Sequence, residues 1–82
     1  MVEFSLMNST RDLDILKRFG EHLKSMRNLK KISLRKLADE ADVDFSQIHR
    51  IEKGQSNPTL TMLLALSKAL GIKTGELLDF DQ

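Results

Sequence analysis

Residues 45–53 carry side chains that can form hydrogen bonds with the edges of DNA bases. On a helical wheel, with about 100° between successive residues, the two isoleucines and Glu52 cluster on one side. The opposite side carries Arg50, which can bond both acceptors of a guanine edge in the major groove. An ordinary surface arginine bonded to Asp44 or Glu40 is the alternative. The candidate base-reading residues are Phe45, Ser46, Gln47, His49 and Arg50.

Contacts with DNA phosphates are expected from helix starts and from a polar loop near this segment. The first amides of a helix have no partner within the helix and therefore bind anions. We expect such helix starts at Ser33 to Arg35 and at Thr59 to Leu60. The candidate residues for contacts with the DNA backbone are Ser33, Arg35, Lys53, Gln55, Asn57 and Thr59.

Two short helices joined by a turn would position these side chains. Apolar residues of the first helix recur at i, i+3, i+4 and i+7, namely at Leu34, Leu37, Ala38 and Ala41. Ser33 can cap this helix, residues 42–44 break the pattern, and Asp44 can cap the second helix. Each helix is too short to be stable alone, so both must pack against other elements. The small Ala38 would allow the two helices to cross closely, with Val43 filling the wedge between them.

Longer helices are predicted before and after this pair. The first begins at a cap on Ser9 or Thr10 and ends near Lys30. Its central stripe consists of Leu13, Leu16, Gly20, Leu23 and Arg27, with Ile15, Phe19 and Met26 beside it. After the pair, Gly54 is suited to a left-handed helix end, and Thr59 can cap a helix over residues 60–70.

The helix over residues 60–70 is rich in leucine, which leaves only a narrow outward strip, predicted to be Thr61, Ala65 and Lys68. Gly71 would end this helix, and Thr74 can cap a last short one. The pattern as a whole predicts an all-α fold with five helices.

These spacings resemble the DNA-binding helix-turn-helix of the phage repressor and Cro type, often called the XRE family. The resemblance covers roughly residues 16–78 and rests on Arg27, Leu37, Ala38, Val43, Ile48, Ile51, Glu52, Gly54, Pro58, Leu63 and Leu70. It implies a repressor-like domain over residues 11–82, with the helix-turn-helix at the second and third helices. It further implies a sequence-specific transcriptional regulator that binds double-stranded DNA, with residues 45–53 in the major groove.

The resemblance also suggests roles for individual residues. In similar proteins the arginine matching Arg27 pairs with the acid matching Glu52, so we expect a structural ion pair. The position of Phe45 reads bases in phage repressors, although its ring could instead lie over Ile48 or the stem of Arg35. Two positions depart from the pattern. Leu34 replaces a glutamine that often contacts phosphate. Asp42 replaces a glycine in the turn, so it must adopt a positive φ, which aspartate tolerates better than most residues.

A homodimer is expected, because one recognition helix reads only a few base pairs and similar proteins bind paired half-sites. The predicted dimer interface consists of Met62, Ala69, Leu78 and Phe80. Residues 1–10 are predicted to be an arm that is disordered or associated with the dimer, and Val2, Phe4 and Leu6 in it alternate as in a strand.

Composition and charge restrict the classes of function. A chain of 82 residues with 40% hydrophobic residues can form one small core. Its net charge of +1 is weak evidence for a nucleic-acid partner, but between residues 17 and 36 the only acid among the many basic residues is Glu21. There is no Cys, no leader-like segment and no apolar run near 18 residues, so we expect a cytoplasmic protein with no membrane partner.

An enzyme is not expected. The sequence has no glycine-rich phosphate loop and no metal-ligand spacing around His22 and His49, so we predict neither a metal nor another cofactor. Ser46, His49 and Glu52 lie three residues apart on one helix and cannot converge as a catalytic triad does. The main alternative is a protein-interaction module, such as an antitoxin-like partner, that keeps the fold but binds another protein through its apolar helices.

Overall fold

The computed structural model describes residues 10–81, so nearly all of the predicted arm, including Ser9, lies outside the described residues. The described chain forms five helices: α2 (Thr10–Leu29), α3 (Leu34–Ala41), α4 (Phe45–Glu52), α5 (Leu60–Leu70) and α6 (Thr74–Leu77). None of the residues from 10 to 81 is in a strand. The prediction of an all-α, five-helix fold is confirmed.

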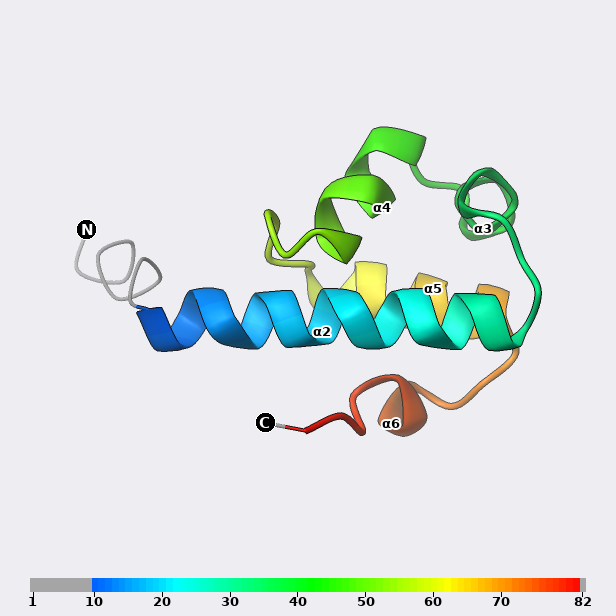
Figure 1. Cartoon of the computed structure of the whole chain (residues 1–82). Helices are drawn as coiled ribbons and strands as arrows, with labels where there is room; N and C mark the ends of the chain where they lie inside the picture. Colours follow the sequence, from blue (N-terminus) through cyan, green and yellow to red (C-terminus); the bar gives the residue numbers. More distant parts are fainter. Residues whose placement is uncertain (1–9, 82) are drawn as a thin grey trace.

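Helix α2 runs along the molecule and the shorter helices surround it (Figure 1). It packs against α4 on one side and α6 on the other, and α5 packs against α3 and α6. Helices α3 and α4 pack against each other as the predicted pair. Both have eight residues, a length that is marginal in isolation, so their stability depends on these contacts.

A single hydrophobic core joins all five helices. Its buried members are Phe19, Leu23, Leu37, Ala38, Ile48, Ile51, Leu66, Leu70 and Leu77. Burying each large aliphatic side chain stabilises the fold by about 1.5–3 kcal/mol. Each helix thus contributes at least one anchor, and α4 is held to the rest by the two isoleucines on its inner side.

Most helix ends follow the predicted chemistry. The hydroxyl of Ser33 accepts a hydrogen bond from the Lys36 amide at 3.1 Å, and that of Thr59 accepts one from the Met62 amide at 3.2 Å. Gly54 and Gly71 both adopt the left-handed conformation, with φ of 74° and 70°. These contacts fix where α3 and α5 begin and where α4 and α5 end.

Two predicted caps are wrong. Asp44 stands at the cap position of α4, but its carboxylate accepts a hydrogen bond from the Ser46 hydroxyl and makes no cap bond. At α6 the cap position belongs to Lys73, whose amide donates to the Glu76 carboxylate at 3.0 Å. The Thr74 hydroxyl is hydrogen-bonded to the hydroxyl of Ser67 at 2.9 Å instead.

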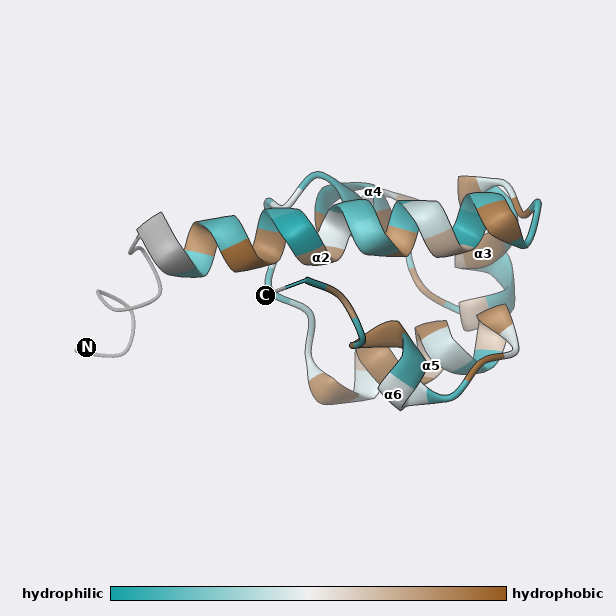
Figure 2. Cartoon of the chain, turned by 60° about the horizontal axis from the view of Figure 1, so that its bottom comes forward, coloured by the Kyte–Doolittle hydropathy of each residue, from teal (hydrophilic) through white to brown (hydrophobic). Residues whose placement is uncertain are grey.

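The outward face of α5 is wider and more apolar than predicted. Leu60 is 67% exposed and Leu64 is 50% exposed, whereas Ser67 is buried. Ser67 can be buried because its hydroxyl bonds the Leu64 carbonyl and the Thr74 hydroxyl, which satisfies its polar atoms. On α2, Leu13 is likewise half exposed rather than part of the core. Figure 2 looks onto α5 and α6 and shows hydrophobic residues along both helices.

Candidate nucleic-acid interface

The turn between α3 and α4 sets the angle at which α4 leaves the body. Asp42 adopts the left-handed conformation, with φ of 57° and ψ of 47°, as its place in the turn requires. The Val43 amide donates to the Ala38 carbonyl at 3.0 Å, which closes the turn. Ala38 is only 2% exposed, and Val43 packs against the core. Ala38 at the helix crossing and Val43 in the wedge between the helices thus occupy the predicted places.

Two glycines allow the end of α4 to lie against α2. A methyl group at Gly20 would lie 2.5 Å from the Ile51 carbonyl oxygen and closer still to that of Glu52. A Cβ at Gly54 would lie 2.7 Å from the Cα of Lys17. Only glycine permits this approach of one backbone to another. The sequence analysis placed Gly20 in the apolar stripe of the first helix but did not predict that it lies against the backbone of α4. A glycine among the apolar residues of that stripe is the signal that could have indicated such a close approach.

An ion pair joins the same two helices near the end of α2. Arg27 Nε donates to Glu52 Oε2 at 2.7 Å, and a second nitrogen of the guanidinium donates to Oε1 at 3.0 Å. The third nitrogen bonds the Ile32 carbonyl at 3.0 Å. The two side chains are only 11% and 5% exposed. Its hydrogen bonds to the Glu52 carboxylate raise the pKa of Arg27, so the guanidinium stays charged and fixes α4 on α2.

The outer face of α4 is free of structural contacts with the core. Ser46, Gln47, His49 and Arg50 are exposed, while the isoleucines and Glu52 between them are buried. Within the described part of the chain, Arg50 forms no ion pair and no side-chain hydrogen bond. In particular, it does not pair with Asp44 or Glu40, the two acids named as the alternative partners. The helix therefore separates an inner side that holds the fold from an outer side that presents donors and acceptors.

Phe45, the first residue of α4, does not extend freely into solvent. Its ring is half-buried, and the guanidinium carbon of Arg35 lies over it, 4.6 Å from the ring centroid. The His49 ring, one turn along α4, lies 6.2 Å from the Phe45 ring at an angle of 21°. The ring thus lies against Arg35, as one interpretation of the sequence expected, although the group over the ring is the guanidinium and not the stem named there.

The residues predicted to contact phosphates lie at the start of α3, just after α4 and just before α5. Ser33 and Thr59 cap α3 and α5, so their hydroxyls already accept bonds from their own helices. Lys53 follows α4 and is exposed, as is Gln55, whose amide donates to the Arg50 carbonyl at 2.9 Å. Asn57 lies farther along and lines a hollow with Ile15 and Leu16 of α2. Lys53 and Gln55 are therefore the residues of this set closest in sequence to the outer face of α4.

The four residues predicted for a dimer interface differ in exposure. Met62 and Ala69 of α5 are half-buried against the core, and Leu78 is 40% exposed. The Phe80 ring packs within the chain, with its centroid 5.7 Å from that of Phe19. It lies at the same distance from His22. Leu60 and Leu64, which the sequence placed inside, present more apolar surface than any of these four.

Ser46, His49 and Glu52 are not arranged as a catalytic triad. The Glu52 carboxylate is bound to Arg27 on the buried side of α4, whereas Ser46 and His49 lie on the exposed side, so the three do not converge. No group of three or more potential metal ligands occurs among the described residues. Among those residues no helix has the length and apolar character needed to cross a membrane.

Comparisons with known proteins identify the same architecture. A family model described as helix-turn-helix matches residues 23–77. The control protein C.BamHI of Bacillus amyloliquefaciens is 40% identical over 63 residues, which cover 76% of this chain and 78% of that protein. The crystal structure of the restriction-modification controller protein C.AhdI from Aeromonas hydrophila matches with a TM-score of 0.74 and 37% identity, covering 76% of this chain and 94% of that one.

The structure of the clp gene regulator ClgR from Corynebacterium glutamicum matches with a TM-score of 0.73 and 26% identity, over 78% of this chain and 83% of that one. The model match includes α3, the turn and α4, the elements that hold the exposed donors in place. These relatives are regulatory proteins. The chain belongs to the helix-turn-helix family of sequence-specific, DNA-binding transcriptional regulators.

Proposed function

We propose that this protein is a control protein of a restriction-modification system that binds two-fold symmetric double-stranded DNA as a homodimer. Helix α4 of each subunit enters the major groove of one half-site. The observation that carries this proposal is the division of α4, whose outer side presents Ser46, Gln47 and Arg50 while its inner side is fixed on α2. Control and controller proteins are the relatives that share about two-fifths of their sequence with this chain. A cytoplasmic location follows from such a role.

Base reading and phosphate binding divide between neighbouring residues. Arg50, exposed and without a partner among residues 10–81, has the fork of donors that matches O6 and N7 of guanine. The Ser46 hydroxyl donates a hydrogen bond to the Asp44 carboxylate, so toward a base it acts as a hydrogen-bond acceptor. Lys53 and Gln55, just after the helix, contact phosphates and fix the position of the protein on the duplex.

Dimerisation uses α5 and the end of the chain. The exposed Leu60 and Leu64 lie one turn apart, and Leu78 adds apolar surface after α6. Exposed leucines along one helix face are typical of a surface that another subunit covers. In this proposal Met62 and Ala69 border the interface, and Phe80 supports it from within its own subunit. A two-fold dimer would place two α4 helices in successive major grooves, roughly 34 Å apart.

The test is selection of binding sites from random duplexes, followed by titration of the selected and a scrambled duplex at several salt concentrations. Arg50→Ala is expected to weaken binding to the selected duplex by about 1–3 kcal/mol and to leave binding to the scrambled duplex nearly unchanged. Lys53→Ala, the control for charge, is expected to weaken both alike and to reduce the salt slope by about one unit per site.

Two results would count against the proposal. If no sequence is enriched from the random pool, the fold serves another purpose, and a protein-interaction module becomes the better explanation. If Arg50→Ala weakens binding to both duplexes equally, Arg50 contacts the DNA backbone and base reading must come from other residues of α4.

A further inference from the structure

The guanidinium of Arg35 lies over an aromatic ring. Its guanidinium carbon lies 4.6 Å from the centroid of the Phe45 ring. Arg35 is exposed, and within residues 10–81 no carboxylate pairs with it. Arg35 belongs to α3 and Phe45 to α4, so the contact spans the turn of the helix-turn-helix.

We infer that Arg35 is a specificity-determining residue that contacts a guanine edge, and that Phe45 is the positioning residue that holds it there. This inference rests on the proposed function, in which α4 enters the major groove. It assigns to Arg35 a contact with a base instead of the phosphate contact expected from its place at the start of α3. It also gives Phe45 a supporting role in place of the base contact that the family resemblance suggests.

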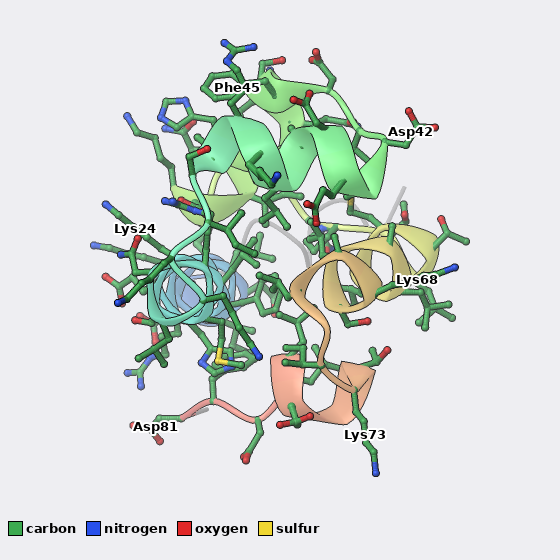
Figure 3. The ribbon with its side chains drawn as sticks, turned by 90° about the vertical axis from the view of Figure 1, so that its right-hand side faces the viewer. Lys24, Asp42, Phe45, Lys68, Lys73 and Asp81 are labelled. Atoms are coloured by element: carbon green, nitrogen blue, oxygen red, sulfur yellow. The ribbon has the colours of Figure 1, made fainter. Side chains whose placement is uncertain are left out.

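The geometry at the start of α4 carries this assignment. The N-terminal residues of a recognition helix are those that contact base edges, and Phe45 is the first residue of α4. Figure 3 shows Phe45 at the outer end of the molecule, opposite the end that carries Lys73 and Asp81. The contact with Phe45 therefore places the Arg35 guanidinium at the part of α4 that meets the bases.

The chemistry of the contact between Arg35 and Phe45 favours a contact with a base edge over an attraction to phosphate charge alone. A guanidinium over an aromatic face is held by its cation–π attraction, and its N–H groups at the edge remain available to acceptors. An ion pair with a carboxylate would occupy those N–H groups. Holding the long side chain in place before binding also reduces the conformational entropy lost when it contacts a base.

His49 completes the support on the α4 side. Its ring lies 6.2 Å from the Phe45 ring and is inclined to it by 21°. The Phe45 ring is therefore bounded by Arg35 from α3 and by His49 from its own helix. The ring thus lies between these two neighbours with its face toward the guanidinium.

The experiment measures binding of the full chain to the selected and scrambled duplexes, with Arg35→Ala, Arg35→Lys, Phe45→Leu and Phe45→Tyr. Arg35→Ala is expected to weaken binding to the selected duplex by about tenfold to 100-fold, with little change on the scrambled duplex. Arg35→Lys keeps the charge but lacks the fork of donors, so it should show nearly the same loss. Repeating the site selection with Arg35→Ala should remove the base preference at one position per half-site.

Phe45 is tested through its coupling to Arg35. Phe45→Leu removes the aromatic face and is expected to weaken binding to the selected duplex, whereas Phe45→Tyr keeps the face and should bind like the wild type. The double variant Arg35→Ala, Phe45→Leu should bind no more weakly than Arg35→Ala alone. Thermal melts of each variant separate these effects from loss of folding.

Several outcomes would overturn the inference. Equal losses of Arg35→Ala on the selected and the scrambled duplex would show a phosphate contact, and additive losses in the double variant would show that Phe45 acts independently of Arg35. Either result leaves the proposed function standing, because the wild-type protein still selects a sequence. Failure of the wild-type protein to select any sequence would remove the proposed function itself, and this inference with it.

Discussion

The pair formed by Arg27 and Glu52 allows a quantitative prediction of stability. Both side chains are nearly buried, at 11% and 5% exposure, and two hydrogen bonds of 2.7 and 3.0 Å join them. Removing one partner leaves the other charge buried without compensation, which typically costs about 3–5 kcal/mol. In a domain of this size the total stability is about 5–15 kcal/mol, so one substitution should remove a large part of it.

The two single variants should differ. Arg27→Ala leaves the Glu52 carboxylate without its partner and the Ile32 carbonyl without its donor, so we expect a loss near the upper value of about 5 kcal/mol. Glu52→Ala leaves an arginine that still bonds Ile32 and lies in the last turn of α2, where the helix dipole favours a cation. Its long side chain can also move toward water, so a loss of about 3 kcal/mol is expected.

Urea unfolding would measure both losses at one fixed protein concentration, because the stability of the proposed dimer would depend on concentration. The double variant Arg27→Met, Glu52→Met is the control, since two apolar side chains leave no buried charge. It should be about as stable as the wild type. Losses under about 1 kcal/mol in each single variant would refute the reasoning and show that the pair is effectively exposed.

The pH dependence of this pair follows from the raised pKa of Arg27. A group whose pKa is raised on folding contributes stability that is fully present below its unfolded pKa and is lost only as the pH rises through the folded value. Arginine is already protonated far above neutral pH. The contribution of Arg27 to the free energy of unfolding should therefore be constant across neutral and mildly alkaline pH, as measured by urea unfolding at several pH values. A change in the free energy of unfolding near neutral pH that is absent in Arg27→Ala would contradict this prediction.

Three further predictions concern packing, the turn and the dimer. Gly20→Ala should lower the unfolding free energy by about 1–3 kcal/mol, because its methyl group would overlap carbonyl groups of α4. The control variant Gly75→Ala, whose Cβ meets nothing within 4 Å, should be neutral or slightly stabilising when both variants are compared by thermal melts. Asp42→Gly should raise stability by up to about 1 kcal/mol, because it relieves a left-handed residue, and a decrease would show that the aspartate stabilises the turn in another way. Leu64→Glu should convert the proposed dimer to a monomer in sedimentation, whereas Leu29→Glu, at a leucine that is even more exposed but lies at the end of α2, should not. Equal effects of the two substitutions would place the interface elsewhere.

Much of the architecture could be predicted because its signals are local. The apolar spacing of α3 and α4, the hydroxyls of Ser33 and Thr59, and the glycine that ends α4 each act within a few residues of their own position. Such signals survive in the sequence whatever the rest of the chain does. The ion pair between Arg27 and Glu52 could be predicted only because the two positions match those of a known family.

The missed features depend on which surfaces meet in three dimensions. Leu60 and Leu64 were placed inside because a leucine-rich helix does not show which of its apolar sides faces the core. The sequence does not indicate how Ser67 can be buried, because the partners of its hydroxyl, the Leu64 carbonyl and the Thr74 hydroxyl, come together only in the fold. The contact of Gly20 with the backbone of α4 similarly requires the crossing of two helices that the sequence does not specify.

The division of α4 into a buried and an exposed side bears on how binding preference can change during evolution. Gly20, Ile48 and Glu52 determine where the helix lies, while Ser46, Gln47 and Arg50 contribute almost nothing to holding it there. Mutations at the three exposed positions can therefore accumulate at little cost in stability. A duplicated copy of such a protein could acquire a new operator before losing its fold, and a designer could exchange these three residues as a cassette.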